Sequence, residues 1–505
     1  MDSLYHRRLN RQSLARGTVC AFLLAASVCG LRVRHIAESS RAQSSLINGA
    51  VPSTTDVARV RADRSVYLKP PLRVLPRAGG KFSDPVFDTE IMRATDAADC
   101  PAPGCGTWYN QWPTFNANNT RLLIRRGESG EMMIKAFDPV NFALGPILRA
   151  SPKVGGTTPN WQGAMWSRTD PDLIFVEGAY YDPNYPASGM KLYSYRPSTD
   201  TFAVFKNFGP LLSPGNPDYL FEMHVDAHDD IFTFMQYRVG DGGNPIYFIV
   251  WKRSTDQVLL HIRNDQSLDA NACVPDKSGR WIFFALNKVQ ADKSAHKIWD
   301  MQTNTWQTIY WNADDDSPSH GDLGTGIVVG HGNFSGGANR RSLSDVHKST
   351  VVFDYKDANG QVDWSNDQHM TLYADDESWA TMALWGESNV SNTGAFKDEV
   401  MQFALDGSQR IRRLFHHRSR IDNLTATSGY WAIPKPTISR DGRFIAFTSN
   451  WENSGRYDLF IARIDPGPRL LKQPAASTPI STPSKSARPR RVSQRTITGK
   501  PRNQN

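Results

Sequence analysis

The chain has 505 residues, of which 39% are apolar and 11% aromatic, including 14 Trp. This composition can form a large apolar core, which excludes a wholly disordered protein. The formal charge of +8 is concentrated at the two ends, since residues 1–41 carry +5 and residues 466–505 carry +9. The body between them is therefore mildly acidic, at −6. It offers no folded basic face, so we expect no nucleic-acid partner.

Residues 1–41 have the layout of a secretory signal with a short polar segment. Several Arg, the last of them Arg16, precede an apolar stretch from Val19 to Leu31. That stretch is shorter than the roughly 20 residues of a membrane-spanning helix. We expect a signal peptide or an N-terminal anchor and an extracytoplasmic location, whether periplasmic, secreted or membrane-anchored. Membrane contact is expected only through this segment, if it stays uncleaved.

Two further segments are expected to lie outside the folded core, and three cysteines are expected to lie within the folded part of the chain. Residues 42–85 are rich in Ser, Pro and Arg without clear periodicity and are expected to be a linker, whereas residues 466–505 are expected to be a disordered basic tail. Cys100 and Cys105 flank Pro-Ala-Pro-Gly. This spacing is compatible either with a small disulfide or with two free thiols. Cys273, in an apolar strand context, is expected to be an inert core residue.

An isolated strand-like run from Val86 to Thr95 precedes a pattern that recurs about every fifty residues. Each unit contains an apolar second strand after a turn, a third strand and an outer strand. The predicted second strands are 121–124, 173–176, 231–235, 281–286, 326–330, 381–385 and 444–448. The third strands are predicted to begin near Glu131, Lys191, Tyr247, His296, Ser349, Asp398 and Tyr457. The predicted outer strands are 142–148, 202–205, 258–262, 306–310, 362–364 and 410–415.

Seven such units, each with about one four-stranded sheet, predict an all-β fold, a seven-bladed β-propeller over residues 86–465. The seventh unit lacks an outer strand, because Asp465-Pro466-Gly467-Pro468 ends it. We expect the run at 86–95 to pair into this last blade, which closes the ring and covers an open sheet edge. A β-sandwich is the weaker alternative, since seven similar units exceed one sandwich domain.

The last unit carries the clearest local signal. Asp441-Gly442 separates two strand-like runs, and Gly accepts the positive φ of a tight hairpin turn. The segment Pro436–Asn450, followed by Tyr457-Asp458-Leu459-Phe460, resembles the TolB-type, WD40-like β-propeller repeat. Only this blade matches closely. The resemblance implies a propeller and an extracytoplasmic setting, and it transfers no substrate because propellers serve binding, scaffolding and catalysis alike.

Turn lengths distinguish the two faces of the predicted ring. The short-turn face is defined by predicted turns at 118–119, 198–200, 254–256, 359–360, 406–407 and 441–442. The long-loop face is defined by predicted segments at 177–189, 207–221, 312–321, 331–348, 386–397 and 416–430. Long loops on a rigid scaffold often carry function, so the long-loop face around the central channel is the predicted site.

Several histidines are expected to reach this site. His224 enters an inner strand from the long-loop face, His320 and Asp322 enter the fifth inner strand, and His331 leaves the following strand toward that face. The candidate ligand-binding residues are His224, His320, Asp322, His331, His417 and Trp431. Because neutral imidazoles with a carboxylate can hold a divalent metal or a polar ligand, His224, His320 and His331 are also the candidate metal ligands. Local hydrogen bonding is the alternative for each histidine.

Tryptophans near the channel offer a further surface. Trp161, Trp166, Trp379 and Trp431 are candidates for stacking on sugar rings, and core packing between blades is the alternative. No Ser nucleophile motif or paired acidic motif stands out, so no catalytic residue is assigned.

Two functions therefore remain open. The first is an exported binding or scaffold protein, expected to be a monomer, that binds a protein or polysaccharide on the long-loop face without a definite cofactor. The second is a metal-assisted polysaccharide lyase, with a divalent metal ion in the central channel, because the repeats are related to those of oligogalacturonate lyases. That resemblance implies a metal, held largely by histidines, which would bind a uronate carboxylate and acidify the neighbouring proton. Where those lyases have a His before Pro-x-x-Ser-x-Asp-Gly, this chain has Trp431-Ala432-Ile433-Pro434-Lys435.

Overall fold

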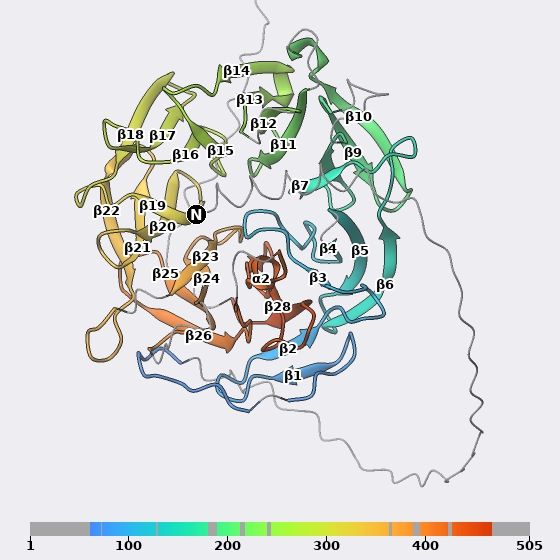
Figure 1. The fold of residues 1–505 in the computed structure, drawn as a ribbon, viewed down its shortest axis with the longest axis vertical. Helices are drawn as coiled ribbons and strands as arrows, with labels where there is room; N and C mark the ends of the chain where they lie inside the picture. The colour runs from blue at the N-terminus through green and yellow to red at the C-terminus, as the bar shows by residue number, and fades with distance from the viewer. Residues whose placement is uncertain are drawn as a thin grey trace, which may run out of the picture. The chain divides into compact units, whose positions relative to one another are not determined.

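The computed structural model describes residues 61–466 except 72, 128–129, 180–188, 213–217, 240–243, 363–365, 387–393 and 423–426. These residues form seven antiparallel sheets, the blades, which follow one another around a ring (Figure 1). The prediction of a seven-bladed β-propeller is confirmed. The predicted signal segment and the predicted tail beyond Pro466 lie outside the described residues.

Blades 1 to 6 each contain four strands in chain order, with the first strand nearest the ring centre (Figure 1). Blade 1 contains β3 Cys105–Gly106, β4 Arg121–Arg126, β5 Glu131–Asp138 and β6 Ala143–Ala150. Blade 2 contains β7 Asn160–Trp166, β8 Ile174–Glu177, β9 Lys191–Arg196 and β10 Thr201–Asn207. Blade 3 contains β11 Asp218–Val225, β12 Ile231–Arg238, β13 Tyr247–Lys252 and β14 Gln257–Arg263. Blade 4 contains β15 Ala270–Pro275, β16 Trp281–Leu286, β17 Ser294–Asp300 and β18 Thr305–Tyr310.

The remaining blades follow the same plan, with additions at the end of the chain. Blade 5 contains β19 Pro318–Leu323, β20 Ile327–Gly332, β21 Gly337–Ser342 and β22 Asp345–Asp354. Blade 6 contains β23 Asp367–Thr371, β24 Trp379–Trp385, β25 Glu399–Ala404 and β26 Ile411–His416. Blade 7 contains β27 Thr437–Ile438, β28 Phe444–Ser449 and β29 Asp458–Arg463, together with β2 Glu90–Arg93 and β1 Lys81–Ser83. The short helices are η1 Gly209–Leu211, η2 Arg253–Thr255 and α2 Thr427–Ala432.

Blade 7 closes the ring with strands from both ends of the propeller. β2 pairs antiparallel with β29, with Glu90 opposite Arg463 and Arg93 opposite Phe460, as predicted for the run at 86–95. β1, which lies in the segment expected to be a linker, pairs with β2 and adds a fifth strand. The segment before residue 86 therefore also contributes to the sheet and covers the edge of β2.

Blade 5 differs from the prediction. Its third strand is β21, not a strand beginning near Ser349, and its outer strand is β22, not 362–364. The predicted long loop 331–348 is therefore wrong, because it contains all of β21. Gly-Ala-Asn-Arg-Arg-Ser lacks apolar alternation, and the buried Arg341 in it is held by backbone carbonyls, including that of Asp316 at 2.7 Å. Residues 363–365 lie outside the described part of the chain.

Aromatic side chains pack between neighbouring blades. Phe444 of blade 7 lies 5.1 Å from Phe137 of blade 1 between ring centroids. Trp161, Trp166 and Trp379 are also buried, which favours core packing for these three. Burying these aromatic rings away from water makes a large apolar contribution to the stability of the fold.

The described residues show the state of three cysteines. Cys100 and Cys105 form a disulfide, with their Cα atoms 6.0 Å apart, and Cys273 is a buried thiol. In the part of the chain that the structure covers, no helix has the length and apolar content needed to cross a bilayer.

Candidate functional site

A short segment of blade 1 crosses the central channel. Residues Trp108–Trp112 leave β3 after only two strand residues and contact three other blades. The Asn110 amide donates to the Met370 carbonyl of blade 6, and the Gln111 amide donates to the Gly321 carbonyl of blade 5 at 3.3 Å. The Trp112 indole donates to the Met223 carbonyl of blade 3 at 3.0 Å. This channel segment therefore fixes the floor of the space above it.

A cavity of about 540 Å³ lies at the long-loop end of the channel, against blades 3 to 5. Its aromatic lining consists of Trp108, Tyr109, Trp112, Phe283, Trp311, Tyr430 and Trp431. Its amide lining consists of Gln111, Gln162, Asn271, Asn287 and Asn333. Its charged or titratable lining consists of Glu222, Lys288, His296, His320 and Asp322. Aromatic faces with a few polar groups are typical of a small-molecule or sugar site.

Three inner strands bulge at this cavity. β7, β11 and β19 each lose register with their neighbouring strand, and each has a residue with positive φ there, namely Gly163, Glu222 and His320. At Gly163 a Cβ atom would lie 3.0 Å from Glu222 Cα, so only glycine lets these two strands approach. A left-handed backbone is strained for Glu222 and His320, and such strain gathers at functional sites. The bulges bring Glu222 and His320 to the cavity wall.

The cavity wall contains buried polar atoms without partners. The indole N–H groups of Trp108 and Trp431 have no hydrogen-bond acceptor among the described residues, although both side chains are buried. His296 Nε2 donates to the Pro318 carbonyl at 2.7 Å, and its Nδ1 has no partner among those residues. Burial lowers the pKa of His296 to about 4, so the ring is neutral and Nδ1 is an acceptor. Buried polar groups are normally satisfied, so the cavity wall contains three buried nitrogens whose hydrogen-bonding capacity the described residues leave unused.

A second carboxyl group lies behind Glu222. Glu177, at the end of β8, is fully buried and accepts a hydrogen bond from the Asn160 amide at 2.7 Å. Burial and the neighbouring Glu222 charge raise its pKa well above the usual range. Glu222 lies at the cavity surface, with the Gln162 amide 3.4 Å away.

Three of the six predicted ligand-binding residues line the cavity. His320 Nδ1 lies 2.7 Å from Asp367 Oδ1, and the His320 ring stacks on His369. Asp322 accepts hydrogen bonds from the Leu323 and Leu372 amides, and burial raises its pKa. Trp431 lies beneath the Arg125 guanidinium, 3.8 Å from the ring centroid.

The other three predicted residues lie elsewhere. The His224 ring stacks on Trp112 at 5.3 Å, beside a smaller space of about 40 Å³ below the cavity. Burial lowers its pKa to about 3. The His331 ring stacks on Tyr355 and is not part of the cavity wall. His417 is fully buried, with Nε2 donating to the Leu384 carbonyl at 2.9 Å and Nδ1 accepting from the Ser419 amide, so its ring is part of the core.

The described residues do not fit the divalent metal considered from the sequence. They contain no group of three or more His, Cys, Asp or Glu side chains arranged to hold a metal ion. His320 and His331 both lie near Asp367, whose charge acts on each ring, whereas His224 stacks on Trp112. The three candidate ligands therefore do not form one metal-holding group. We therefore assign no role to a metal.

Sequence analysis missed Glu222, Gln162 and the channel segment. The run Trp-Tyr-Asn-Gln-Trp had one detectable signal, since it is rich in aromatic and amide side chains yet has no strand alternation. Glu222 had none, because a bulge at a non-glycine residue is not marked in the local sequence.

Comparisons with known proteins address the fold. No family model matches the sequence, and no curated protein matches it. An oligogalacturonate lyase in complex with manganese is similar at a TM-score of 0.53 and 13% identity, over 77% of this chain and 97% of that chain. An oligogalacturonate lyase from Vibrio parahaemolyticus is similar at a TM-score of 0.53 and 12% identity, over 78% of this chain and 98% of that chain. At such identities the likeness shows the seven-bladed propeller fold alone.

Proposed function

We propose that this protein is an exported carbohydrate-binding propeller whose site is the cavity on the long-loop face. The observation that carries the proposal is the set of buried, unpartnered polar atoms on Trp108, Trp431 and His296 in an aromatic wall. A sugar presents apolar ring faces and a rim of hydroxyl groups that both donate and accept. Aromatic faces pack on the first, and indole N–H groups, an imidazole acceptor and amides bond to the second.

Export is supported by two independent features. The N-terminal segment has the pattern of a secretory signal, and Cys100 and Cys105 form a disulfide, a bond typical of oxidising compartments. A partner protein on the long-loop face is the competing occupant, and a concave cavity of about 540 Å³ favours a small glycan over a protein surface.

A lyase acting on uronate polysaccharide is the alternative function. The fold likeness to two oligogalacturonate lyases supports it, and one of those lyases is in complex with manganese. The described residues argue against it, because no group of metal-ligating side chains converges among them. Fold likeness at this level carries no activity by itself.

The test is titration calorimetry of the purified protein with neutral oligosaccharides and with oligogalacturonate, together with a spectroscopic assay for unsaturated products. We expect a neutral or charged oligosaccharide to bind without cleavage. Trp311 is 39% exposed at the cavity, and Trp306 is 41% exposed on the outer strand β18 of the same blade. Trp311→Ala is expected to weaken binding about fivefold to tenfold, since one aromatic stacking contact contributes about 1 kcal/mol. Trp306→Ala is the matched control and is expected to bind as the wild type.

Two results would contradict the proposal. One is the absence of heat with every saccharide class at millimolar concentration. The other is an unsaturated product from oligogalacturonate, which would favour the lyase. Equal affinities of the Trp311→Ala and Trp306→Ala variants would move the sugar away from this cavity.

A further inference from the structure

The floor of the cavity determines how a glycan can enter and leave it, and this step rests on the proposed function. The channel segment lies beneath the cavity and separates it from the smaller space of about 40 Å³ below. Gln111 lines both spaces and donates to the Gly321 carbonyl, and Trp112 donates to the Met223 carbonyl. A glycan chain therefore cannot continue through the channel, and any part of it that extends beyond the cavity has to cross the rim.

The charges around the cavity do not select a class of sugar. The carboxylate and Lys side chains of its described wall are Glu222, Asp322 and Lys288. Arg125 and Lys435 lie over the Trp431 ring, at 3.8 and 4.9 Å from its centroid. Lys277 lies near Asp322, and its charge interacts with that carboxylate. Because charges of both signs surround the cavity, its aromatic surface is the better guide to the ligand.

An exposed aromatic pair, the rim pair, consists of Trp311 and Phe334 and lies at the rim by blades 4 and 5. Among the described residues, three exposed large hydrophobic side chains are aromatic, and these two contact each other with ring centroids 5.5 Å apart. Trp311 lines the cavity, and Phe334, which is 44% exposed, follows the lining residue Asn333. Exposed apolar side chains scattered singly are normal, whereas contiguous ones that adjoin a cavity are typical of a ligand surface.

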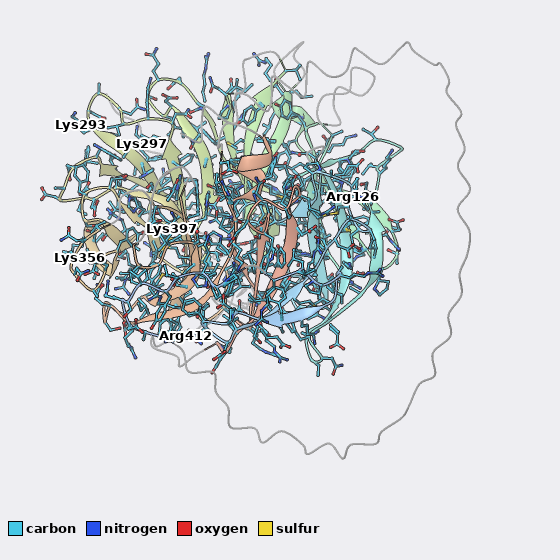
Figure 2. All side chains as sticks on the ribbon, turned by 60° about the horizontal axis from the view of Figure 1, so that its bottom comes forward. Arg126, Lys293, Lys297, Lys356, Lys397 and Arg412 are labelled. Atoms are coloured by element: carbon cyan, nitrogen blue, oxygen red, sulfur yellow. A yellow bond between two sulfur atoms is a disulfide. The ribbon has the colours of Figure 1, made fainter. Side chains whose placement is uncertain are left out.

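Backbone hydrogen bonds hold the rim pair in place. The Trp311 amide donates to the Lys293 carbonyl at 2.7 Å, and Figure 2 shows Lys293 toward the edge of the molecule. The Phe334 and Ser335 amides donate to the two carboxylate oxygens of Asp316, at 2.7 and 3.2 Å. Asp316 is buried, so the turn between β20 and β21 is fixed against the segment before β19. Rings that are held before a ligand arrives lose little conformational entropy when it binds.

We propose that the rim pair is an outer sugar subsite, so that the ligand is an oligosaccharide with one end in the cavity and the next unit on Phe334. The planes of the two rings are inclined by 63°, so they cannot both lie flat on one pyranose ring. Successive units of a glycan are turned relative to each other about the glycosidic bond. Each aromatic ring is therefore matched to a different sugar unit, Trp311 at the mouth of the cavity and Phe334 outside it.

The experiment is titration calorimetry with oligomers of increasing length, from the monosaccharide to the hexasaccharide. The probes are β-1,4-linked glucose, β-1,4-linked N-acetylglucosamine and α-1,4-linked galacturonate. We expect the affinity of the wild type to rise with length until a unit reaches Phe334 and then to level off. Phe334→Ala is expected to weaken binding of the longer oligomers about fivefold, the effect of one aromatic contact, and to leave the shortest oligomer that binds unchanged. Phe334→Trp keeps an aromatic face and should bind every length as the wild type.

Trp306→Ala is the matched control, because Trp306 is an exposed aromatic residue of β18 outside the cavity, and it should not change the length dependence. One protein molecule per glycan chain is also expected, whatever the length of the chain. Several protein molecules on one soluble polymer chain would mean binding along the chain and would overturn the inference. An equal loss for every length in Phe334→Ala would show that Phe334 only supports Trp311, which overturns the inference and leaves the proposed function intact. Absence of binding by every oligomer would overturn both.

Discussion

The two ends of the central channel differ in their charged groups: the short-turn end joins blades by ion pairs, although Arg168 Nε and Tyr373 Oη there also lack a hydrogen-bond partner among the described residues. At the short-turn end, Arg168 of blade 2 and Arg440 of blade 7 share Asp375 of blade 6, each with one contact of 2.8 Å. Lys277 of blade 4 pairs with Glu377 of blade 6 at 2.8 Å. At the long-loop end, three nitrogens of the cavity wall have no partner among the described residues: the indole nitrogens of Trp108 and Trp431 and Nδ1 of His296.

This difference separates a structural closure from a site. Ion pairs between blades 2, 4, 6 and 7 hold the ends of non-adjacent sheets together across the channel. Unpartnered buried groups instead cost stability in the free protein and are recovered only when a ligand binds. The two ends should therefore respond in opposite ways to substitution, one in stability and the other in affinity.

Breaking the short-turn end should have the largest effect. Arg168 is buried, donates to the Tyr373 carbonyl and to Asp375, and lies 4.2 Å from the Tyr373 ring centroid. Arg168→Ala is expected to lower the free energy of unfolding by about 3 kcal/mol, because it breaks a buried ion pair. The loss should not be larger, because Asp375 is half-exposed and keeps its ion pair with Arg440. Urea unfolding measures this, and saccharide affinity should not change.

The control is an ion pair on the same blade. Arg196 pairs with Asp170 at 2.9 Å, and its side chain is 47% exposed. Arg196→Ala is expected to change stability by no more than about 0.5 kcal/mol. Equal losses of stability in Arg168→Ala and Arg196→Ala would show that the ion pairs at the short-turn end stabilise the fold no more than an exposed ion pair does.

Acidification should have the second largest effect on stability. It should act by protonating buried histidine when the chain unfolds, and not by breaking the ion pairs at the short-turn end. Burial lowers the pKa of His224 to about 3, so the unfolded chain binds a proton there at a higher pH than the folded chain. Stability from His224 is therefore present above pH 6.5 and falls as pH drops toward 3, by about 2 kcal/mol between pH 7 and pH 5. Although burial acts to raise it, the Arg440 hydrogen bond and the Arg168 charge lower the pKa of Asp375, which stays ionised in this range.

The measurement is urea unfolding of the wild type and His224→Gln at pH 7 and pH 5. Glu177 acts with the opposite sign, because its raised pKa favours folding as pH falls, so the difference between the two proteins is what isolates His224. The variant should lose about 2 kcal/mol less than the wild type on acidification. An identical loss would mean that His224 is protonated in the fold.

The sequence predicts the ring better than it predicts the site. Hairpin turns at a regular interval and the missing outer strand of the last unit were enough for seven blades and their closure. Blade 5 was misassigned because β21 buries Arg341 where an apolar residue would mark a strand, and its charge is satisfied by carbonyls that only the fold brings near.

Site residues divide in the same way. Asp322 and Trp431 were predicted because they belong to segments entering inner strands on the correct face, which is a matter of topology. Glu222 was missed because its position depends on a bulge. His417 was overvalued because its Nε2 donates to the Leu384 carbonyl of another strand, a partner that the local sequence does not indicate. The sequence pattern predicts which face of the ring a residue lies on. Backbone bulges and hydrogen-bond partners, which the pattern does not indicate, decide which side chains reach the cavity.

The smallest expected effect comes from one indole nitrogen and tests the comparison most directly. Trp431 has an unpartnered N–H in the cavity wall, whereas the Trp166 N–H donates to the Thr114 carbonyl at 3.2 Å. Trp431→Phe should weaken saccharide binding by about 1 kcal/mol, the value of one hydrogen bond, and should cost the free protein only the lost ring volume. Trp166→Phe should leave affinity unchanged and destabilise the fold more, because it also removes a buried hydrogen bond to the Thr114 carbonyl, which then keeps only its bond from the Leu123 amide. Calorimetry and urea unfolding of both variants decide the matter. If Trp431→Phe lost stability but kept its saccharide affinity, the Trp431 N–H would not bond to a ligand. That result would contradict the proposed saccharide site in this cavity.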